Sequence, residues 1–417
     1  MSKIKADYGQ AGKRRWTVLL GGFLLSLVGG MSYAWGSFVV PLVNDWGWSA
    51  AEATLPLTML IAVFAVTMIP AGWLQDRIGP RKVATVGSIL FLVGYSLASL
   101  MRFIPSHTWL ILMYGGVVGV ACGLTYSCIA PTARKWYADR PGFAVSTAVM
   151  GFGLASVVVA PLKKVMIDAL GVDGTIFLLG IFVFVFSIAG ARLMRNPDPD
   201  WTPPQLAGPS HKTTRKIPVT VKDVPPGQFI RTPVFYSLWL ALAAVIGGGL
   251  TAIGLLIPFG ELHLKLTPTE AALSISIFSL VNGLGRPVAG WLADRIGVVR
   301  VMIIVYTVQA AVFLAMPWVV TSYLLLLVCS FLLGAGYAVT FALFPVLVAS
   351  GFGTRYLGIN YGLVFSAFGI GALTGFIGSK LLDSTGSFTP AFLLAGTTTL
   401  IGLAILILLR KKLGNRS

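Results

Sequence analysis

Residues 72–79 read GWLQDRIG, and residues 290–297 read GWLADRIG, so the two stretches are identical at seven of eight positions. A match of this length within one chain indicates an internal duplication. Each copy lies at the end of a long apolar run, which ends near Leu74 in the first copy and near Leu292 in the second. The chain is therefore expected to consist of two similar halves, each with a helix that ends in this motif.

The two copies also contain residues suited to contacts that form and break. In each copy a glycine lets the end of the helix approach a neighbour closely, and an adjacent Asp-Arg pair can bind charges or helix ends. These residues are Gly72, Asp76 and Arg77 in the first copy and Gly290, Asp294 and Arg295 in the second. Contacts of this kind can hold one conformation and be lost in another, so we expect conformational-switch motifs.

The composition is that of a membrane protein. Of 417 residues 56% are hydrophobic and only 11% are charged, whereas soluble domains have roughly 25% charged residues. Uncharged runs of about twenty residues are long enough to cross a hydrocarbon core about 30 Å thick. The first run is too long for a signal peptide, and eleven similar runs follow it. The expected helices lie at 16–43, 51–74, 82–101, 108–132, 142–168, 173–194, 232–259, 268–292, 298–318, 321–350, 357–383 and 388–410.

One long polar connection divides these helices into two sets of six. It contains eight prolines and the basic cluster Lys212–Lys216, so we expect an extended segment. The expected organisation is an N-terminal six-helix bundle over residues 1–195, a cytoplasmic linker over 196–231 and a C-terminal six-helix bundle over 232–417. The fold class is thus an all-α integral membrane protein with twelve transmembrane helices and pseudo-two-fold symmetry.

The basic residues set the orientation. If the N-terminus is cytoplasmic, 25 of the 31 Lys and Arg residues fall on the cytoplasmic side. Those at or near the outside are Arg102, Lys163, Lys164, Lys265 and Lys380. This asymmetry follows the positive-inside rule, so the net charge of +17 does not require a nucleic-acid partner. We expect a multi-pass protein of the plasma (inner) membrane with both termini in the cytoplasm.

The sequence offers no catalytic or metal site. Cys122, Cys128 and Cys329 fall in predicted helices without metal-ligand spacing, and the three histidines are scattered. No phosphate-binding loop is present. We therefore expect neither an enzyme nor a metal or cofactor.

Arg286 is the residue most suggestive of function. It lies near the middle of an expected helix, where a cation costs about 2.5–3.5 kcal/mol, and no acidic residue lies in the central part of any expected helix. A guanidinium can hold a carboxylate with two parallel hydrogen bonds. Asn282, one turn earlier, can bind a substrate oxygen. Pro287 is expected to make the helix irregular and to leave backbone groups for a ligand; a kink needed only for packing is the alternative.

Aromatic residues are expected to shape the rest of a pocket. For any single one, packing against lipid or other helices accounts for it equally well, although a buried tyrosine hydroxyl needs a partner. The candidates are Tyr126, Tyr337, Phe341, Phe365, Phe368 and Tyr33.

The repeated GWLxDRIG resembles the loop signature of the major facilitator superfamily, which implies two six-helix bundles that rock about a central site. The segment from Arg286-Pro287 through the second motif resembles the monocarboxylate transporter family and the related oxalate/formate antiporters. So do RTPVFY at 231–236 and RKWY at 134–137, followed by RPGFA at 140–144. In these families the arginine of helix 8 binds the substrate carboxylate, a role that the resemblance implies for Arg286.

Three departures from these families bear on the substrate. Animal-type monocarboxylate transporters have an aspartate, implicated in proton coupling, where this chain has Asn282, and a helix 1 lysine that is absent after Ser32–Trp35. The antiporters have a lysine in helix 11 at the position of Phe368. One central cation suits a monoanion such as lactate or pyruvate. With Asn282 unable to titrate, the nearest candidates for proton coupling are Glu261 and His263.

The leading interpretation is proton-linked symport of a small monocarboxylate by alternating access. The first alternative is exchange of organic anions, of the oxalate/formate type, without a proton. The second, from another class, is a membrane sensor that binds a carboxylate without moving it. A sensor usually has a soluble signalling domain, and the short predicted tails have no room for one.

Overall fold

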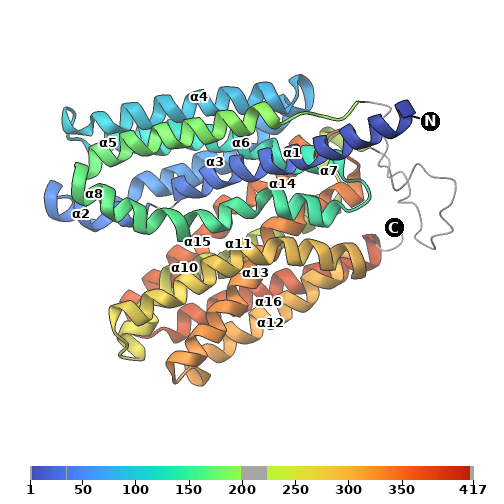
Figure 1. The fold of residues 1–417 in the computed structure, drawn as a ribbon. Helices are drawn as coiled ribbons and strands as arrows, with labels where there is room; N and C mark the ends of the chain where they lie inside the picture. The colour runs from blue at the N-terminus through green and yellow to red at the C-terminus, as the bar shows by residue number, and fades with distance from the viewer. Residues whose placement is uncertain (1, 34, 199–222, 414–417) are drawn as a thin grey trace.

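The structure, a computed structural model, describes residues 2–33, 35–198 and 223–413 (Figure 1). Its helices are α1 (Ser2–Tyr33), α2 (Gly36–Trp46), α3 (Ala50–Ile78), α4 (Pro80–Ser99), η1 (Leu100–Arg102), α5 (His107–Leu110), η2 (Ile111–Val118), α6 (Gly119–Ser127), α7 (Ile129–Trp136), α8 (Pro141–Leu193), α9 (Pro226–Phe229), α10 (Pro233–Pro258), η3 (Phe259–His263), α11 (Pro268–Ile296), α12 (Val298–Val319), α13 (Tyr323–Phe352), α14 (Leu357–Phe365), α15 (Ala367–Thr385) and α16 (Thr389–Leu413). The expected linker falls mostly on 199–222, outside these residues.

The predicted all-helical membrane fold is confirmed. Among the described residues, 11 helices are long and apolar enough to cross a membrane. The twelfth crossing is the first part of α8, because Gly171 has a φ of 72° and divides α8 into two spans. Large apolar side chains such as Val66, Val288 and Leu408 are exposed on the outer helix surfaces, as a lipid-facing surface requires.

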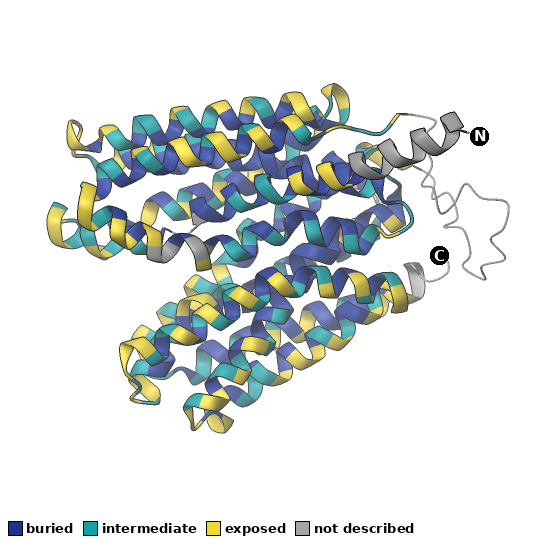
Figure 2. Ribbon diagram, in the orientation of Figure 1, coloured by how far each residue is buried: buried dark blue, intermediate teal, exposed yellow. Residues whose placement is uncertain are grey.

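The helices form two groups in Figure 1. α1 to α8, blue to green, pack together, and α10 to α16, yellow to red, pack together. The groups meet chiefly where α11 contacts α8 and where α14 contacts α3. We call the end at which α1 begins, α8 ends and α10 begins the linker side. In Figure 2 the buried residues lie between the helices, and the exposed ones lie on the outer faces and at the ends.

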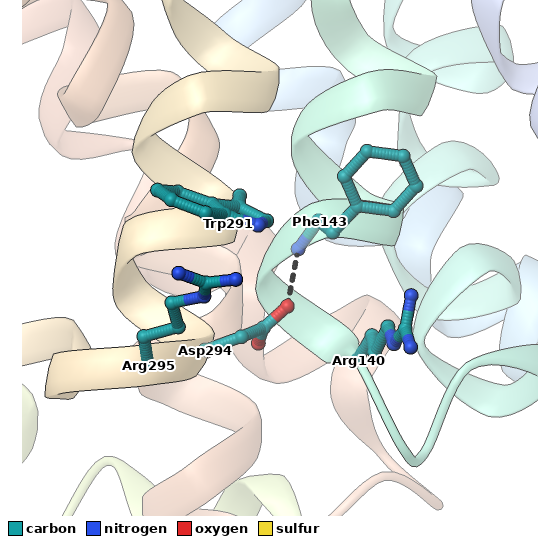
Figure 3. Close-up of a pocket in the computed structure, with 5 residues that line it drawn as sticks. All are labelled: Arg140, Phe143, Trp291, Asp294 and Arg295. Atoms are coloured by element: carbon teal, nitrogen blue, oxygen red, sulfur yellow. Dashed lines mark hydrogen bonds between the residues drawn. The ribbon is translucent and has the colours of Figure 1, made fainter. Parts of the chain in front are cut away.

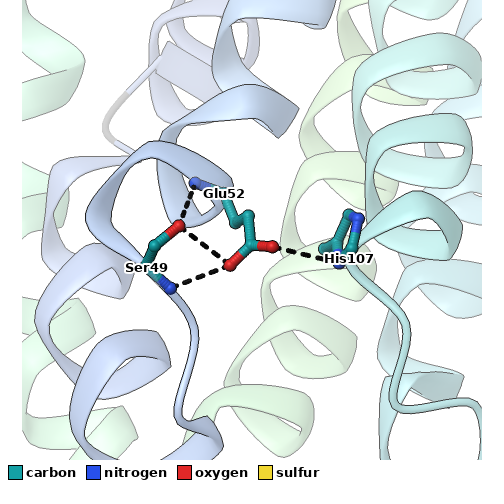
Figure 4. Close-up of polar contacts among 3 residues, drawn as sticks. All are labelled: Ser49, Glu52 and His107. Carbon is teal, nitrogen blue, oxygen red and sulfur yellow. Dashed lines mark hydrogen bonds and ion pairs between the residues drawn. The ribbon is translucent and has the colours of Figure 1, made fainter.

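The duplication extends beyond the two motifs to the start of the same helices. Ser49 and Glu52 form a capping box at the start of α3, and Thr267 and Glu270 form one at the start of α11. In both boxes the backbone N–H of the first residue donates to the glutamate at 2.9 Å. The two boxes stand at equivalent positions of the duplication, with the same offset in numbering as the two motifs. Only the first adds a histidine: His107 Nδ1 lies 3.8 Å from Glu52 Oε1 (Figure 4).

Several helices differ from expectation. The first predicted helix is divided into α1 and α2, the fourth into α5, η2, α6 and α7, and the eleventh into α14 and α15. Conversely, α11 runs without interruption through Pro287, so the expected irregularity there is wrong. A proline removes one backbone hydrogen bond. Tight packing compensates, because Gly283 lies directly against Leu154 of α8.

Candidate functional site

Arg286 lies at the contact between α8 and α11 and is fully buried. Its Nη1 donates to the carbonyl oxygen of Val149 in α8 at 2.7 Å. Its Nε donates to the Asn282 carbonyl oxygen at 3.1 Å, and its Nη2 donates to Asn282 Oδ1 at 3.0 Å. Asn282 was expected to bind a substrate oxygen; in the structure its Oδ1 accepts from the guanidinium one turn later. The side chain links the two groups of helices.

No carboxylate neutralises this cation in the described part of the chain, where neither ion pair involves Arg286. A guanidinium has five N–H groups. The three bonds above use three of them. The hydroxyls that interact with its charge are those of Tyr126, Tyr337 and Tyr361. The buried Tyr126 hydroxyl completes no hydrogen bond of its own. The site therefore holds a buried positive charge that no carboxylate of the described residues neutralises.

Seven rings in contact with one another lie at and beside the guanidinium and form what we call the aromatic cage. Arg286 Cζ lies 5.1 Å from the centre of the Phe341 ring and 5.9 Å from that of Phe152. The rings also contact one another, as between Tyr337 and Phe341, whose centroids are 5.0 Å apart. The cage comprises Phe64, Tyr126 and Phe152 from the first group and Tyr337, Phe341, Phe365 and Phe368 from the second. Both groups of helices thus build one centre.

The structure brings together all but one of the predicted pocket residues. Tyr33 is the exception, because its side chain lies outside the described part of the chain. Sequence reasoning missed Phe64, Phe152 and Tyr361, which lie in or beside the cage. Tyr361 precedes Phe365 by one turn, and Phe152 stands between two glycines, Gly151 and Gly153. Helical spacing was the available signal for Tyr361.

Glu261 and His263 lie apart from the cage. Both belong to η3, at the end of α10 opposite the linker side. His263 is exposed, stacks on Phe259 with ring centroids 4.7 Å apart, and lines a pocket with Asp383. Glu261 is partly buried. Within the described residues, neither forms a hydrogen bond or an ion pair with a cage residue.

The two repeated motifs lie on the linker side, and each contacts the helix group to which it does not belong. Asp76, near the end of α3, accepts from the backbone N–H groups of Gly358 at 3.3 Å and Ile359 at 3.0 Å, at the start of α14. Asp294, near the end of α11, accepts from Gly142 and Phe143 at the start of α8, both at 2.8 Å. A carboxylate at a helix N-terminus is stabilised by the helix dipole. We call these four bonds the gate.

The motif glycines make this approach possible. A methyl group on Gly72 would overlap the Gly358 carbonyl, and one on Gly290 would overlap the Gly142 carbonyl. The motif arginines have a different role. Arg77 lies over the Trp73 ring at 4.1 Å, and Arg295 lies over the Trp291 ring at 3.8 Å.

The loops that precede the two gated helices are also anchored. Asp223, just before α9, accepts from the backbone N–H groups of Thr354 at 2.9 Å and Arg355 at 3.0 Å. In the first group, Arg15 of α1 pairs with Asp139 and lies over the Tyr137 ring at 4.0 Å. Burial raises the pKa of Tyr137 to about 12, so this hydroxyl stays neutral. In the first group a residue of α1 thus holds the loop before α8, and in the second group the segment before α9 holds the loop before α14.

Lys163 is a second buried cation, and it lies in the part of α8 away from the linker side, eight residues before the break at Gly171. It is fully buried in α8, where Nζ donates to the Met31 carbonyl oxygen at 3.3 Å and lies 4.6 Å from the Phe38 ring centre. Because α1 ends at Tyr33, its last carbonyls lack partners within the helix, and a cation there is favourable. Lys163 lies roughly four helical turns beyond Val149, or about 21 Å along the helix axis, so it does not belong to the cage.

Comparison with known proteins agrees with this architecture. The sequence matches the profile of the Major Facilitator Superfamily over residues 18–263 and 242–416. The chain belongs to this superfamily. Membership establishes a multi-pass membrane transporter and not an enzyme, and it confirms the family expected from the repeated motif.

Relatives within the superfamily include carboxylate transporters. The chain is 26% identical to the oxalate:formate antiporter of Oxalobacter formigenes, over 97% of this chain and 94% of that protein. It is 29% identical to monocarboxylate transporter 13 of Bos taurus, over 94% and 89% of the two chains. Among solved structures, FucP in the outward conformation has a TM-score of 0.68 at 14% identity, over 93% of this chain and 98% of FucP.

Proposed function

We propose that this superfamily member is a secondary transporter of a small monocarboxylate, of the size of lactate or pyruvate, coupled to protons. The observation that carries the proposal is Arg286, a fully buried cation at the contact between the two helix groups, with no carboxylate partner in the described chain. A substrate carboxylate would supply the missing negative charge and accept two charge-assisted hydrogen bonds. The aromatic cage would enclose the small apolar remainder of such an anion.

The charge of the cage supports a monoanion. Phe368 packs in the cage, with its ring 5.8 Å from that of Phe341, at the position where the resemblance to the antiporters implies a lysine. Among the described side chains, Arg286 is then the one cation of the cage. A dicarboxylate would bring a second negative charge into this apolar surrounding without a partner, which is costly.

The two helix groups, residues 1–195 and 232–417, are the proposed moving bodies, joined by the linker 196–231. We propose that the linker side faces the cytoplasm of the plasma membrane, because 25 of the 31 basic residues then lie inside. With the gate formed, access from that side is closed. Breaking the gate bonds would let the groups rock about the cage and open it to the cytoplasm.

The test of transport is uptake of labelled lactate, pyruvate, oxalate and acetate by proteoliposomes, with and without an imposed pH gradient. Symport predicts that lactate accumulates when the outside is acidified. Because an anion and a proton together carry no net charge, an imposed membrane potential should have little effect. Absence of uptake for all four acids, with lactate still bound, would instead favour the sensor.

The proton carrier is proposed to be Glu261, with His263 as its alternative, since Asn282 cannot titrate. Glu261→Gln should then abolish accumulation driven by a pH gradient but spare exchange of internal for external lactate, which need not return an empty carrier. His263→Ala is the parallel test, and Asp168→Asn, an exposed acid near the same end of the molecule, is the matched control. If both variants still accumulate lactate, neither residue carries the proton.

Exchange of organic anions without a proton is the second candidate, favoured by the similarity to an oxalate:formate antiporter. It predicts that uptake requires an internal anion and ignores the pH gradient. Counterflow into vesicles loaded with formate, lactate or nothing separates it from symport.

A further inference from the structure

The linker side contains a pocket that the proposed transport cycle does not use. It has a volume of about 230 Å³ and lies between α8 and α11, beside the gate bonds of Asp294. Its lining residues, drawn in Figure 3, are Arg140, Phe143, Trp291, Asp294 and Arg295. Arg140 and Phe143 belong to the first helix group, and the other three to the second, so a ligand here would contact both groups.

The pocket is positively charged. Arg140 and Arg295 are exposed, and neither forms an ion pair within the described residues. Asp294 carries one negative charge against the two arginines, so the lining keeps a net positive charge. Figure 3 shows the two guanidiniums on either side of this carboxylate. A small anion could thus be approached by an arginine from each helix group.

The position favours a lipid as the source of that anion. Trp291 is 44% exposed near the end of a membrane-spanning helix, with Arg295 one turn later. Tryptophan at a helix end marks the level of the lipid headgroups. Basic pockets between helices on the cytoplasmic side bind anionic headgroups, and each nearby Arg or Lys contributes about 1 kcal/mol. Phe143 and Trp291 add apolar surface for the adjoining glycerol and acyl carbons.

We propose that this pocket binds the phosphate of an anionic phospholipid of the cytoplasmic leaflet, held by Arg140 and Arg295. Because the two arginines belong to different helix groups, a bound headgroup stabilises the closed gate. Loss of the lipid favours opening on that side. The inference rests on the proposed orientation but not on the identity of the transported anion.

The test compares wild type, Arg140→Gln and Arg295→Gln, purified in detergent, with added phosphatidylglycerol, phosphatidylcholine or inorganic phosphate. Native mass spectrometry counts retained lipid, and thermal unfolding reports its effect. Wild type should retain phosphatidylglycerol and gain a few degrees in Tm from it alone. Each variant should retain about fivefold less, as expected for about 1 kcal/mol per arginine. Arg192→Gln, an exposed arginine of the same side outside the pocket, is the matched control and should behave as wild type.

Closure is measured separately, in nanodiscs with and without phosphatidylglycerol, as the distance between spin labels at positions 82 and 300. Phosphatidylglycerol should increase the short-distance population in wild type but not in Arg140→Gln or Arg295→Gln. Equal retention by the variants and wild type overturns the site, as does an equal loss in Arg192→Gln. A response to inorganic phosphate as large as that to phosphatidylglycerol overturns the lipid assignment. Since none of these readouts requires uptake, they stand apart from the test of transport.

Discussion

The two halves of the duplication are alike at the gate and different in the aromatic cage. At the gate the two halves are alike: each aspartate accepts two backbone N–H groups from a helix start in the other half, and each motif glycine lies against a carbonyl there. At the cage they are not. The positions that the duplication pairs with Asn282 and Arg286 are Phe64 and Met68, both apolar.

Under the proposed mechanism, this difference separates the residues that move from those that bind. A gate made of two equivalent contacts lets the halves close and part as a nearly symmetric pair. In the central site, by contrast, the cation that would bind the anion belongs to the C-terminal half. The N-terminal half contributes rings such as Phe64 and Tyr126. Replacing the single cation of the cage should therefore impair binding of the anion. Removing either gate contact should shift the equilibrium between the closed and open conformations to a similar degree.

The largest effect is expected from Arg286→Lys. The substitution keeps the positive charge but loses the two-pronged hydrogen bonding of the guanidinium and its hold on Val149 and Asn282. Hydrogen bonds to charged groups contribute about 1.5–3 kcal/mol, so lactate uptake should fall at least about tenfold. Initial rates in proteoliposomes measure it, with Arg300→Lys, an exposed arginine, as the control. Near-normal uptake with unchanged affinity would contradict the carboxylate clamp.

A second cation in the cage should change selectivity. Phe368 lies in the cage, 6.3 Å from Phe64 between ring centroids, so Phe368→Lys would place an ammonium near Arg286. Preference should then move toward a dicarboxylate by several-fold, since specificity is a difference of two affinities. The measurement is competition of oxalate against lactate for the same uptake, with Phe376→Lys, an exposed ring on the same helix, as control. No relative gain for oxalate would mean that charge number does not set selectivity.

The smallest effects are expected at the gate. Asp76→Asn and Asp294→Asn each remove a charge from a helix N-terminus, an interaction of about 1 kcal/mol, so each should raise the open fraction on the linker side about fivefold. Spin-label distances between positions 82 and 300, which the duplication also pairs, report that fraction. Because the two contacts are alike, the variants should agree within about twofold. A large shift from only one of them would show that the halves are not equivalent.

The sequence was most informative where a structural feature requires a particular or an unusual residue type. The repeat predicted the gate glycines and aspartates, because a close approach and a helix-end contact need those residue types. Arg286 was apparent because a cation is rare in a membrane helix. The backbone N–H groups that donate to the aspartates could not be predicted, because Gly358 and Gly142 become partners only through packing between helices far apart in the chain.

Other features depend on tertiary structure alone. From the sequence, Lys163 is expected near the end of a membrane span. Its burial depends on the end of α1 at Tyr33, where it donates to the Met31 carbonyl oxygen, and the sequence does not predict that helix end. Phe152 reads as one aromatic among many in an apolar helix. It enters the cage because Gly153 lies against Gly283 and brings α8 close to α11.

Titration calorimetry of wild type and Arg286→Gln with lactate and with lactamide, its neutral amide, tests the role of Arg286 most directly. The two ligands have nearly the same shape and differ in charge. Wild type should bind lactate at least about tenfold more tightly than lactamide, because only the carboxylate can accept two charge-assisted bonds. In Arg286→Gln this preference should disappear. A variant that folds and still prefers lactate by the wild-type ratio would show that the carboxylate is recognised elsewhere.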